Sequence, residues 1–234
     1  MKLISFLQQQ FICLCPWIVR RDSFIPVAMV VLYAALPLVF VGIGSRAISF
    51  IIPTLIVVSA WCIRLLPQDS RAALWDLRPL KKCGEGIVGR FVVGVLATTA
   101  VTYALIPERF MALPRHNPRL WLLVCVLYPL LSVYPQEVIY RAFFFEHSAR
   151  LLPGVRAPWL LSLNVALFAF AHIVFGNVWA PVLSAAGGLL FATTYLKSRS
   201  VMCAALEHAL WGDLIFTIGL GTLFAGGTVA NLLK

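Results

Sequence analysis

Charged side chains are scarce in this sequence. Asp, Glu, Lys and Arg make up 12% of its 234 residues, and 61% of the residues are hydrophobic. An ordinary soluble domain has about a quarter charged and about half apolar residues. A soluble chain has no means of covering so much apolar surface, so the composition excludes a soluble globular protein and indicates a membrane protein.

Acidic residues are the scarcer of the two kinds of charge. Nine Asp and Glu against 19 Lys and Arg give a formal net charge of +10. The basic residues fall in short polar segments between apolar runs and form no single basic stripe. We therefore expect no nucleic-acid partner, and read the excess as the charge bias of membrane-protein loops.

Two kinds of metal or disulfide motif are also lacking. None of the six cysteines forms a CxxC pair, so the sequence indicates neither a structural zinc site nor a disulfide framework. No HExxH pair stands on one apolar segment, which leaves only a weak signal for catalytic zinc. The sequence implies no cofactor.

Long apolar windows recur along the whole chain. They predict an all-α, polytopic transmembrane bundle of about seven to eight membrane helices, in one integral membrane domain over 1–234. The first part, 1–119, carries no chemical signal, whereas 120–226 contains the buried polar residues. The expected spans are 24–43, 47–66, 87–106, 120–147, 158–175, 178–196 and 201–226.

The polar connections predict the orientation. We expect no cleaved signal peptide, and an interfacial helix that places Arg20 and Arg21 at the headgroups. With the N-terminus and the 67–86 loop in the cytoplasm, most Lys and Arg fall inside, although the 107–119 loop opposes this bias. The inside residues would be Lys2, Arg20, Arg21, Arg71, Arg78, Lys81, Lys82, Arg90, Arg150, Arg156, Lys197 and Arg199; the outside ones would be Arg46, Arg109, Arg115 and Arg119.

Ionisable residues inside the apolar runs are the chemical signal. Glu137 and Arg141 lie four residues apart, on one face of a predicted membrane helix. A charge in a span costs roughly 2.5–3.5 kcal/mol on insertion scales, so such residues face a partner or a cavity. An internal ion pair between the two is the purely structural alternative.

Two later spans add further polar groups. Asn164, Phe168 and His172 follow one another at i+4 steps, and Glu207, His208 and Asp213 lie in the last apolar region. Each group alone is also typical of helix–helix hydrogen bonding. One shared polar cavity would account for all three, so we expect them to converge.

A Glu and two His residues in a dry cavity permit two kinds of chemistry. A carboxylate removed from water is a stronger base, and can take a proton from water with the help of one imidazole. The other imidazole can donate to the oxyanion formed when a peptide carbonyl is attacked. Glu and two His can instead bind zinc with one position open, and the residues alone leave this alternative standing.

Three segments also resemble a known family. QEVIYR, FAFAH and EHALWGD are similar, in order, to the EExxxR, FxxxH and HxxxN or HxxxD motifs of the CPBP (Abi) family of intramembrane proteases. That family includes the CAAX prenyl endopeptidases of the Rce1 type. The resemblance covers roughly 135–215, through Glu137, Arg141, Phe168, His172 and His208.

The resemblance implies a metal-independent, glutamic-type peptidase with a polar intramembrane cavity, located in a bacterial inner membrane. It implies that a Glu of the first motif and His172 activate water, and that His208 binds the oxyanion. The chain departs from the pattern at two positions: Gln136 replaces the first Glu, and Gly212 stands where Asn or Asp is expected, followed by Asp213. A Gln cannot act as a base, so either Glu137 takes that role, or the roles are shared differently, or the protein has lost protease activity; we predict the first.

The predicted function is hydrolysis of a peptide bond in a membrane-associated protein or peptide, within the lipid bilayer. Glu137, His172, His208 and Arg141 are the predicted catalytic residues, with support from Gln136, Asp213, Phe168, Asn164 and Glu207. One alternative is a non-catalytic peptide-binding, immunity or scaffold protein. A proton-coupled transporter is less favoured because no internal repeat is visible. The sequence gives no oligomeric state.

Overall fold

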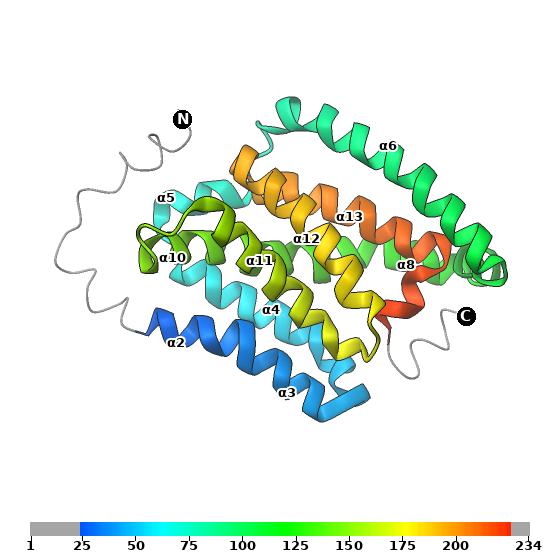
Figure 1. Ribbon diagram of the computed structural model, residues 1–234, viewed down its shortest axis with the longest axis horizontal. Coiled ribbons are helices and arrows are strands. Elements are labelled where there is room, and N and C mark those ends of the chain that lie inside the picture. The colour runs from blue at the N-terminus through cyan, green and yellow to red at the C-terminus, as the bar shows by residue number, and fades with distance from the viewer. Residues whose placement is uncertain (1–23, 226–234) are drawn as a thin grey trace.

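The computed structural model describes residues 24–225, and every regular element in that range is helical (Figure 1). The elements are α2 (Ile25–Val30), η2 (Val31–Ala35), α3 (Leu36–Ile43), η3 (Gly44–Ala47), α4 (Ile48–Leu65), α5 (Gln68–Arg71), η4 (Ala72–Leu74), α6 (Leu80–Leu105), η5 (Pro107–Arg109), α7 (Ala112–His116), α8 (Pro118–Tyr128), η6 (Pro129–Val133), α9 (Tyr134–Glu137), η7 (Val138–Phe143), α10 (Phe144–Leu151), α11 (Ala157–Ala171), η8 (His172–Phe175), α12 (Trp179–Ser198), α13 (Val201–Ile218) and η9 (Leu220–Phe224). The all-α prediction is confirmed.

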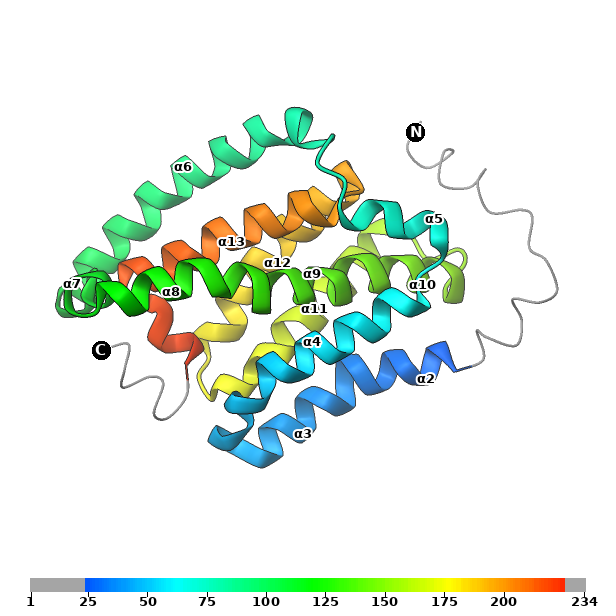
Figure 2. The same ribbon diagram turned by 180° about the vertical axis from the view of Figure 1, so that it is seen from behind.

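Six helical units in this range are long and apolar enough to cross a membrane. The first, Ile25–Leu65, has 41 residues, which at 1.5 Å per residue is about twice the hydrocarbon thickness of a bilayer. The chain reverses at η3, so that α2–α3 and α4 form two antiparallel limbs (Figures 1 and 2). The predicted number of seven to eight spans therefore holds approximately, because the first unit corresponds to the two predicted spans 24–43 and 47–66.

The predicted bounds need correction at two places. The segment 67–86 is not a loop throughout, because α5, η4 and the first turns of α6 lie within it. The last span ends at Ile218 rather than at 226, because Gly219 has φ +103° and a Cβ there would lie 2.1 Å from the Arg109 carbonyl oxygen. The predicted interfacial helix around Arg20 and Arg21 lies outside the described residues.

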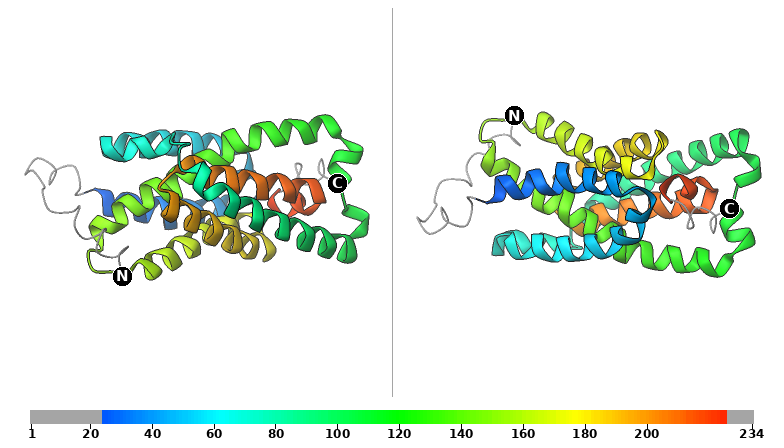
Figure 3. Two further views of the ribbon diagram at one scale, coloured as in Figure 1. Left: turned by 90° about the horizontal axis from the view of Figure 1, so that it is seen from above. Right: turned by 90° about the horizontal axis from the view of Figure 1, so that it is seen from below.

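The long helices run side by side along the long axis of the molecule (Figure 3). α13 packs against α6, α8, α9 and α12, while α6 lies at one flank. Large apolar side chains of α6, among them Val93, Leu96 and Leu105, are exposed, as expected for a surface that faces lipid. The chain is thus an integral membrane protein with a helical bundle around α13.

The segment with the first motif is one continuous helical unit, Pro118–Leu151, that contains two wide π-type turns, η6 and η7. Pro129 begins η6, and Pro135 lies between the two turns. Proline has no N–H for the α-helical ladder, so wide turns at these positions have a physical cause. The wide turns set which side chains of this unit face inward.

Candidate active site

Glu137 is fully buried at the end of α9. Its Oε2 accepts a hydrogen bond from Nε of Arg141 at 3.1 Å, and its Oε1 accepts one from Nδ1 of His208 at 2.9 Å. The spacing of four residues does produce the expected ion pair. Both carboxylate oxygens therefore have partners, one from the same helical unit and one from α13.

Arg141 is also fully buried, and a second set of contacts holds it. Its Nη1 donates to Oδ1 of Asn164, whose Nδ2 donates to the Tyr140 carbonyl at 2.6 Å. The guanidinium carbon lies 4.8 Å from the centre of the Phe168 ring, in cation–π geometry. Arg141 of the first motif thus connects to α11 through a hydrogen bond to the Asn164 amide and a contact with the Phe168 ring.

His208 has a fixed ring position. Its imidazole stacks on Phe191 with centroids 4.3 Å apart and meets Phe168 edge-on at 5.7 Å. A carboxylate can only accept, so Nδ1 of His208 carries a proton toward Glu137. Its Nε2 lies 3.3 Å from the hydroxyl oxygen of Tyr128.

His172 begins η8, directly after α11. Its Nδ1 lies 2.7 Å from the Phe168 carbonyl oxygen, and because a carbonyl only accepts, Nδ1 is the protonated nitrogen of the neutral ring. Its Nε2 then carries the lone pair. Phe168 packs against this ring at 4.8 Å, so the second motif fixes both the tautomer and the orientation of its histidine.

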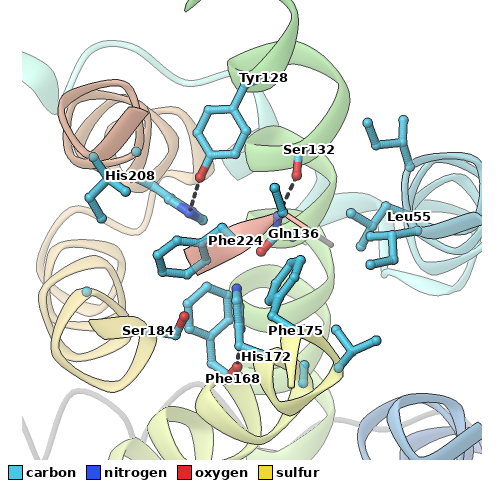
Figure 4. Close-up of a pocket in the computed structure, with 18 of the residues that line it drawn as sticks. Leu55, Tyr128, Ser132, Gln136, Phe168, His172, Phe175, Ser184, His208 and Phe224 are labelled. Carbon is cyan, nitrogen blue, oxygen red and sulfur yellow. Dashed lines mark hydrogen bonds between the residues drawn. The ribbon is translucent and has the colours of Figure 1, made fainter. Parts of the chain in front are cut away.

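A cavity of about 810 Å³, lined mostly by apolar side chains, lies beside these residues. Gln136, His172 and His208 reach it from α9, η8 and α13, and they point toward a common space (Figure 4). Nε2 of Gln136 donates to Oγ of Ser132 at 2.8 Å, so the amide oxygen of Gln136 takes no part in that hydrogen bond. The volume falls within the usual range of about 300–1,000 Å³ for ligand sites.

The predicted site residues therefore fall into three groups: those that line the cavity, those that lie behind its wall, and two acidic residues that stand apart from it. Gln136, Phe168, His172 and His208 line the cavity. Glu137, Arg141 and Asn164 lie behind its wall and are hydrogen-bonded to one another or to His208.

Glu207 and Asp213 stand apart from the cavity lining. Glu207 is fully buried and pairs with Arg90 at 2.7 Å, and it accepts a hydrogen bond from Thr194. One carboxylate oxygen of Asp213 is buried without a hydrogen-bond partner among residues 24–225. Of the two acidic residues predicted in a supporting role, one thus connects α13 with α6 and α12, and neither lines the cavity.

Tyr128 and Ser132 also line the cavity, and neither is among the predicted site residues. Tyr128, Ser132 and Gln136 follow one another at i+4 steps within an otherwise apolar run, which was a usable signal. The N-terminal limbs contribute lining residues as well, including Leu32, Leu36 and Leu55. The first third of the chain thus forms part of the cavity wall, while the predicted division at 119 stays a prediction.

A zinc site gains no support from the geometry of the described residues. No group of three or more His, Cys, Asp or Glu side chains in residues 24–225 is placed to hold a metal ion. Glu137 and His208 are in contact, but His172 is bonded to a backbone carbonyl instead. Metal independence itself stays a prediction.

A comparison with protein families identifies the segment that carries the motifs. The family described as Type II CAAX prenyl endopeptidase Rce1-like matches residues 118–212, somewhat less than half of the chain. No curated protein and no solved structure matches this chain. The match supports a membrane protease of the CAAX type. The matched residues 118–212 contain the first two motifs and His208 of the third, so the similarity to the Rce1-like proteins of the CPBP family lies in the segment that carries these motifs.

Proposed function

We propose that this protein is an intramembrane endopeptidase that hydrolyses a peptide bond of a membrane-associated protein or peptide. The observation that carries the proposal is the convergence of Gln136, His172 and His208 on one largely apolar cavity. Two imidazoles and an amide at one wall supply a proton acceptor and hydrogen-bonding groups where water is largely excluded. The bilayer provides the route by which an anchored substrate would reach the cavity.

The proposed reaction begins with a water molecule between Gln136 and His172. The amide oxygen of Gln136 accepts one hydrogen bond from the water, while the lone pair on Nε2 of His172 takes a proton. The water oxygen bonds to the peptide carbonyl carbon, and the carbonyl oxygen becomes an oxyanion. When the C–N bond breaks, the proton on His172 passes to the leaving nitrogen, so the products are a carboxylic acid and an amine.

Glu137 was predicted as the residue that takes the proton together with His172. Its two oxygens are engaged with Arg141 and His208, and it is absent from the cavity lining. These contacts support a contribution through His208, which Glu137 orients and whose positive charge it would stabilise. In this proposal His208 serves the oxyanion, as the family resemblance implies, and Glu137 is a positioning residue.

A second candidate is peptide binding without catalysis. The observation that favours it is Gln136 itself, because an amide lines the cavity at the position where the family motif has a carboxylate. The cavity would then hold a peptide while Glu137 and Arg141 act as a structural ion pair. The two candidates differ in whether any peptide is cleaved.

The test is cleavage of membrane-anchored reporter peptides by the purified protein in lipid nanodiscs, with products identified by mass spectrometry. We expect cleavage by the wild type, a loss of about 10²–10⁴-fold for His172→Ala, and no change on thorough chelation. His116→Ala is the matched control, since His116 is exposed on α7. Binding of the reporters without cleavage by the wild type would favour the second candidate, and activity restored by zinc after chelation would contradict metal independence.

A further inference from the structure

Tyr128 occupies an unusual place for a tyrosine in an apolar helix. It is the last residue of α8, and its hydroxyl oxygen lies 3.3 Å from Nε2 of His208, at the cavity wall (Figure 4). Its ring meets Phe216 edge-on at 5.2 Å. The aromatic body is held by packing while the hydroxyl reaches the polar end of the cavity.

The other ring nitrogen of His208 and one face of its ring already have partners. Nδ1 donates to Glu137, and Phe191 covers one face of the ring. When Nε2 also carries a proton, it donates to the hydroxyl oxygen of Tyr128, and the hydroxyl hydrogen is then free to point at a ligand. The contacts form one chain of hydrogen bonds, from Arg141 through Glu137 and His208 to Tyr128.

Gly212 provides the space that Tyr128 fills. A Cβ at position 212 would lie 2.2 Å from Cε1 and 2.6 Å from the hydroxyl oxygen of Tyr128, closer than real atoms approach. No side chain at position 212 is therefore compatible with Tyr128 in its observed place. A polar side chain one turn after His208 and the hydroxyl of Tyr128 are alternatives for one position.

We propose, resting on the endopeptidase function above, that Tyr128 is a catalytic residue whose hydroxyl donates to the oxyanion of the tetrahedral intermediate. In this assignment Tyr128 replaces the side chain that Gly212 lacks. The role given to His208 above is thereby made more specific: it serves the oxyanion through the Tyr128 hydroxyl rather than by a direct contact. No proton is transferred from Tyr128: its O–H shares a hydrogen bond with the oxygen that gains charge and releases it when the C–N bond breaks. A fixed donor in a largely apolar cavity stabilises such charge strongly.

Tyr128→Phe removes only the oxygen atom, and it is the direct test. We expect kcat for an anchored reporter peptide to fall about 100-fold, as for other oxyanion donors, with KM nearly unchanged. A peptide phosphinate, which presents a tetrahedral oxyanion, should bind the variant about 100-fold more weakly. The control is Tyr103→Phe, since Tyr103 is 62% exposed on α6 and does not line the cavity.

A double-mutant cycle with position 212 separates this role from a structural one. Gly212→Ala should lower kcat in the wild type, because the added Cβ displaces the ring, and should have no further effect in Tyr128→Ala. Gly212→Asn should raise kcat in the Tyr128→Ala background by placing an amide donor in the vacated space. Cleavage by the wild type with unchanged kcat and phosphinate affinity in Tyr128→Phe would overturn this inference alone, whereas a wild type that cleaves nothing would overturn the endopeptidase proposal with it.

Discussion

At the scale of single residues, two neighbours in the first motif have opposite surroundings. Adjacent helical positions point about 100° apart, so Gln136 lines the cavity while Glu137 is turned into the protein interior. Of these two neighbours, only Glu137 has a charged partner, Arg141, which lies on the same helical unit. The carboxylate that the sequence retains is therefore the one that accepts hydrogen bonds from both Arg141 and His208.

Glu137→Gln is expected to abolish detectable cleavage and to lower the thermal midpoint in detergent. The substitution leaves one acceptor oxygen where His208 and Arg141 now use two. It also leaves Arg141 as a buried cation without a counter-charge, a change that costs about 3–5 kcal/mol in buried pairs. Glu137→Gln combined with Arg141→Gln removes both charges, so it should recover much of the midpoint but none of the activity. The measurements are cleavage rate and thermal unfolding. Cleavage at the wild-type rate in Glu137→Gln would show that neither its charge nor its bond to His208 is needed.

Gln136→Glu tests the cavity position directly. It places a carboxylate beside His172, where the proposed water lies, so we expect the cleavage rate to rise, by at most the roughly 10²–10⁴-fold of a general base. Gln136→Ala, which loses only an orienting amide, should reduce the rate less than His172→Ala does. A Gln136→Glu protein slower than Gln136→Ala would mean that a charge at this position harms water activation.

At the scale of elements, α6 packs against the bundle through α12 and α13. Arg90 on α6 pairs with the buried Glu207 of α13 and donates to Thr194 of α12 at 3.0 Å. One turn further along α6, the ring of Trp211 fits where Gly94 has no side chain. Glu207 and His208 are adjacent in sequence, yet one fastens a flanking helix and the other faces the cavity.

Glu207→Gln should therefore affect stability more than catalysis. Losing hydrogen bonds to a charged group costs about 1.5–3 kcal/mol. The Arg90 side chain is partly exposed, so solvent screens its charge and the loss is smaller. We expect the thermal midpoint to fall by a few degrees, at about 2–4 °C per kcal/mol for a chain of this size, with kcat within about twofold of the wild type. A large loss of kcat with an unchanged midpoint would contradict a purely fastening role and connect Glu207 to the cavity.

The elements also show what sequence patterns could and could not predict. Helical periodicity predicted the i+4 contact of Glu137 with Arg141 and the shared face of Phe168 and His172, because both are local. The contact of Tyr128 with His208 depends on packing between segments 80 residues apart, and the ordinary helical period does not predict the wide turns η6 and η7. Which of two adjacent residues lines a cavity depends on such turns, so Gln136 and Glu137 could not be told apart from spacing alone.

At the scale of the whole molecule, hydropathy was sufficient for the fold class but not for the cavity. Lining residues come from both limbs of the first helical pair and from α8, α12 and α13, so the site needs the complete bundle. Six helical units in residues 24–225 are long and apolar enough to cross a membrane, but these properties do not give the direction of crossing. Only the distribution of Lys and Arg bears on that direction.

The orientation can be tested at the two ends of α6. Its 26 residues span about 39 Å at 1.5 Å per residue, longer than a hydrocarbon core of about 30 Å, so its ends should lie on opposite sides. Cys83 is in its first turns and Glu108 is exposed just beyond its end. In variants whose only cysteine is at 83 or, through Glu108→Cys, at 108, we expect an impermeant maleimide to label position 108 in intact cells. Cys83 should react only after the membrane is opened, because the Lys and Arg of 67–86 favour the cytoplasm. The reverse pattern would invert the topology, and labelling of both positions in intact cells would mean that α6 does not cross the membrane.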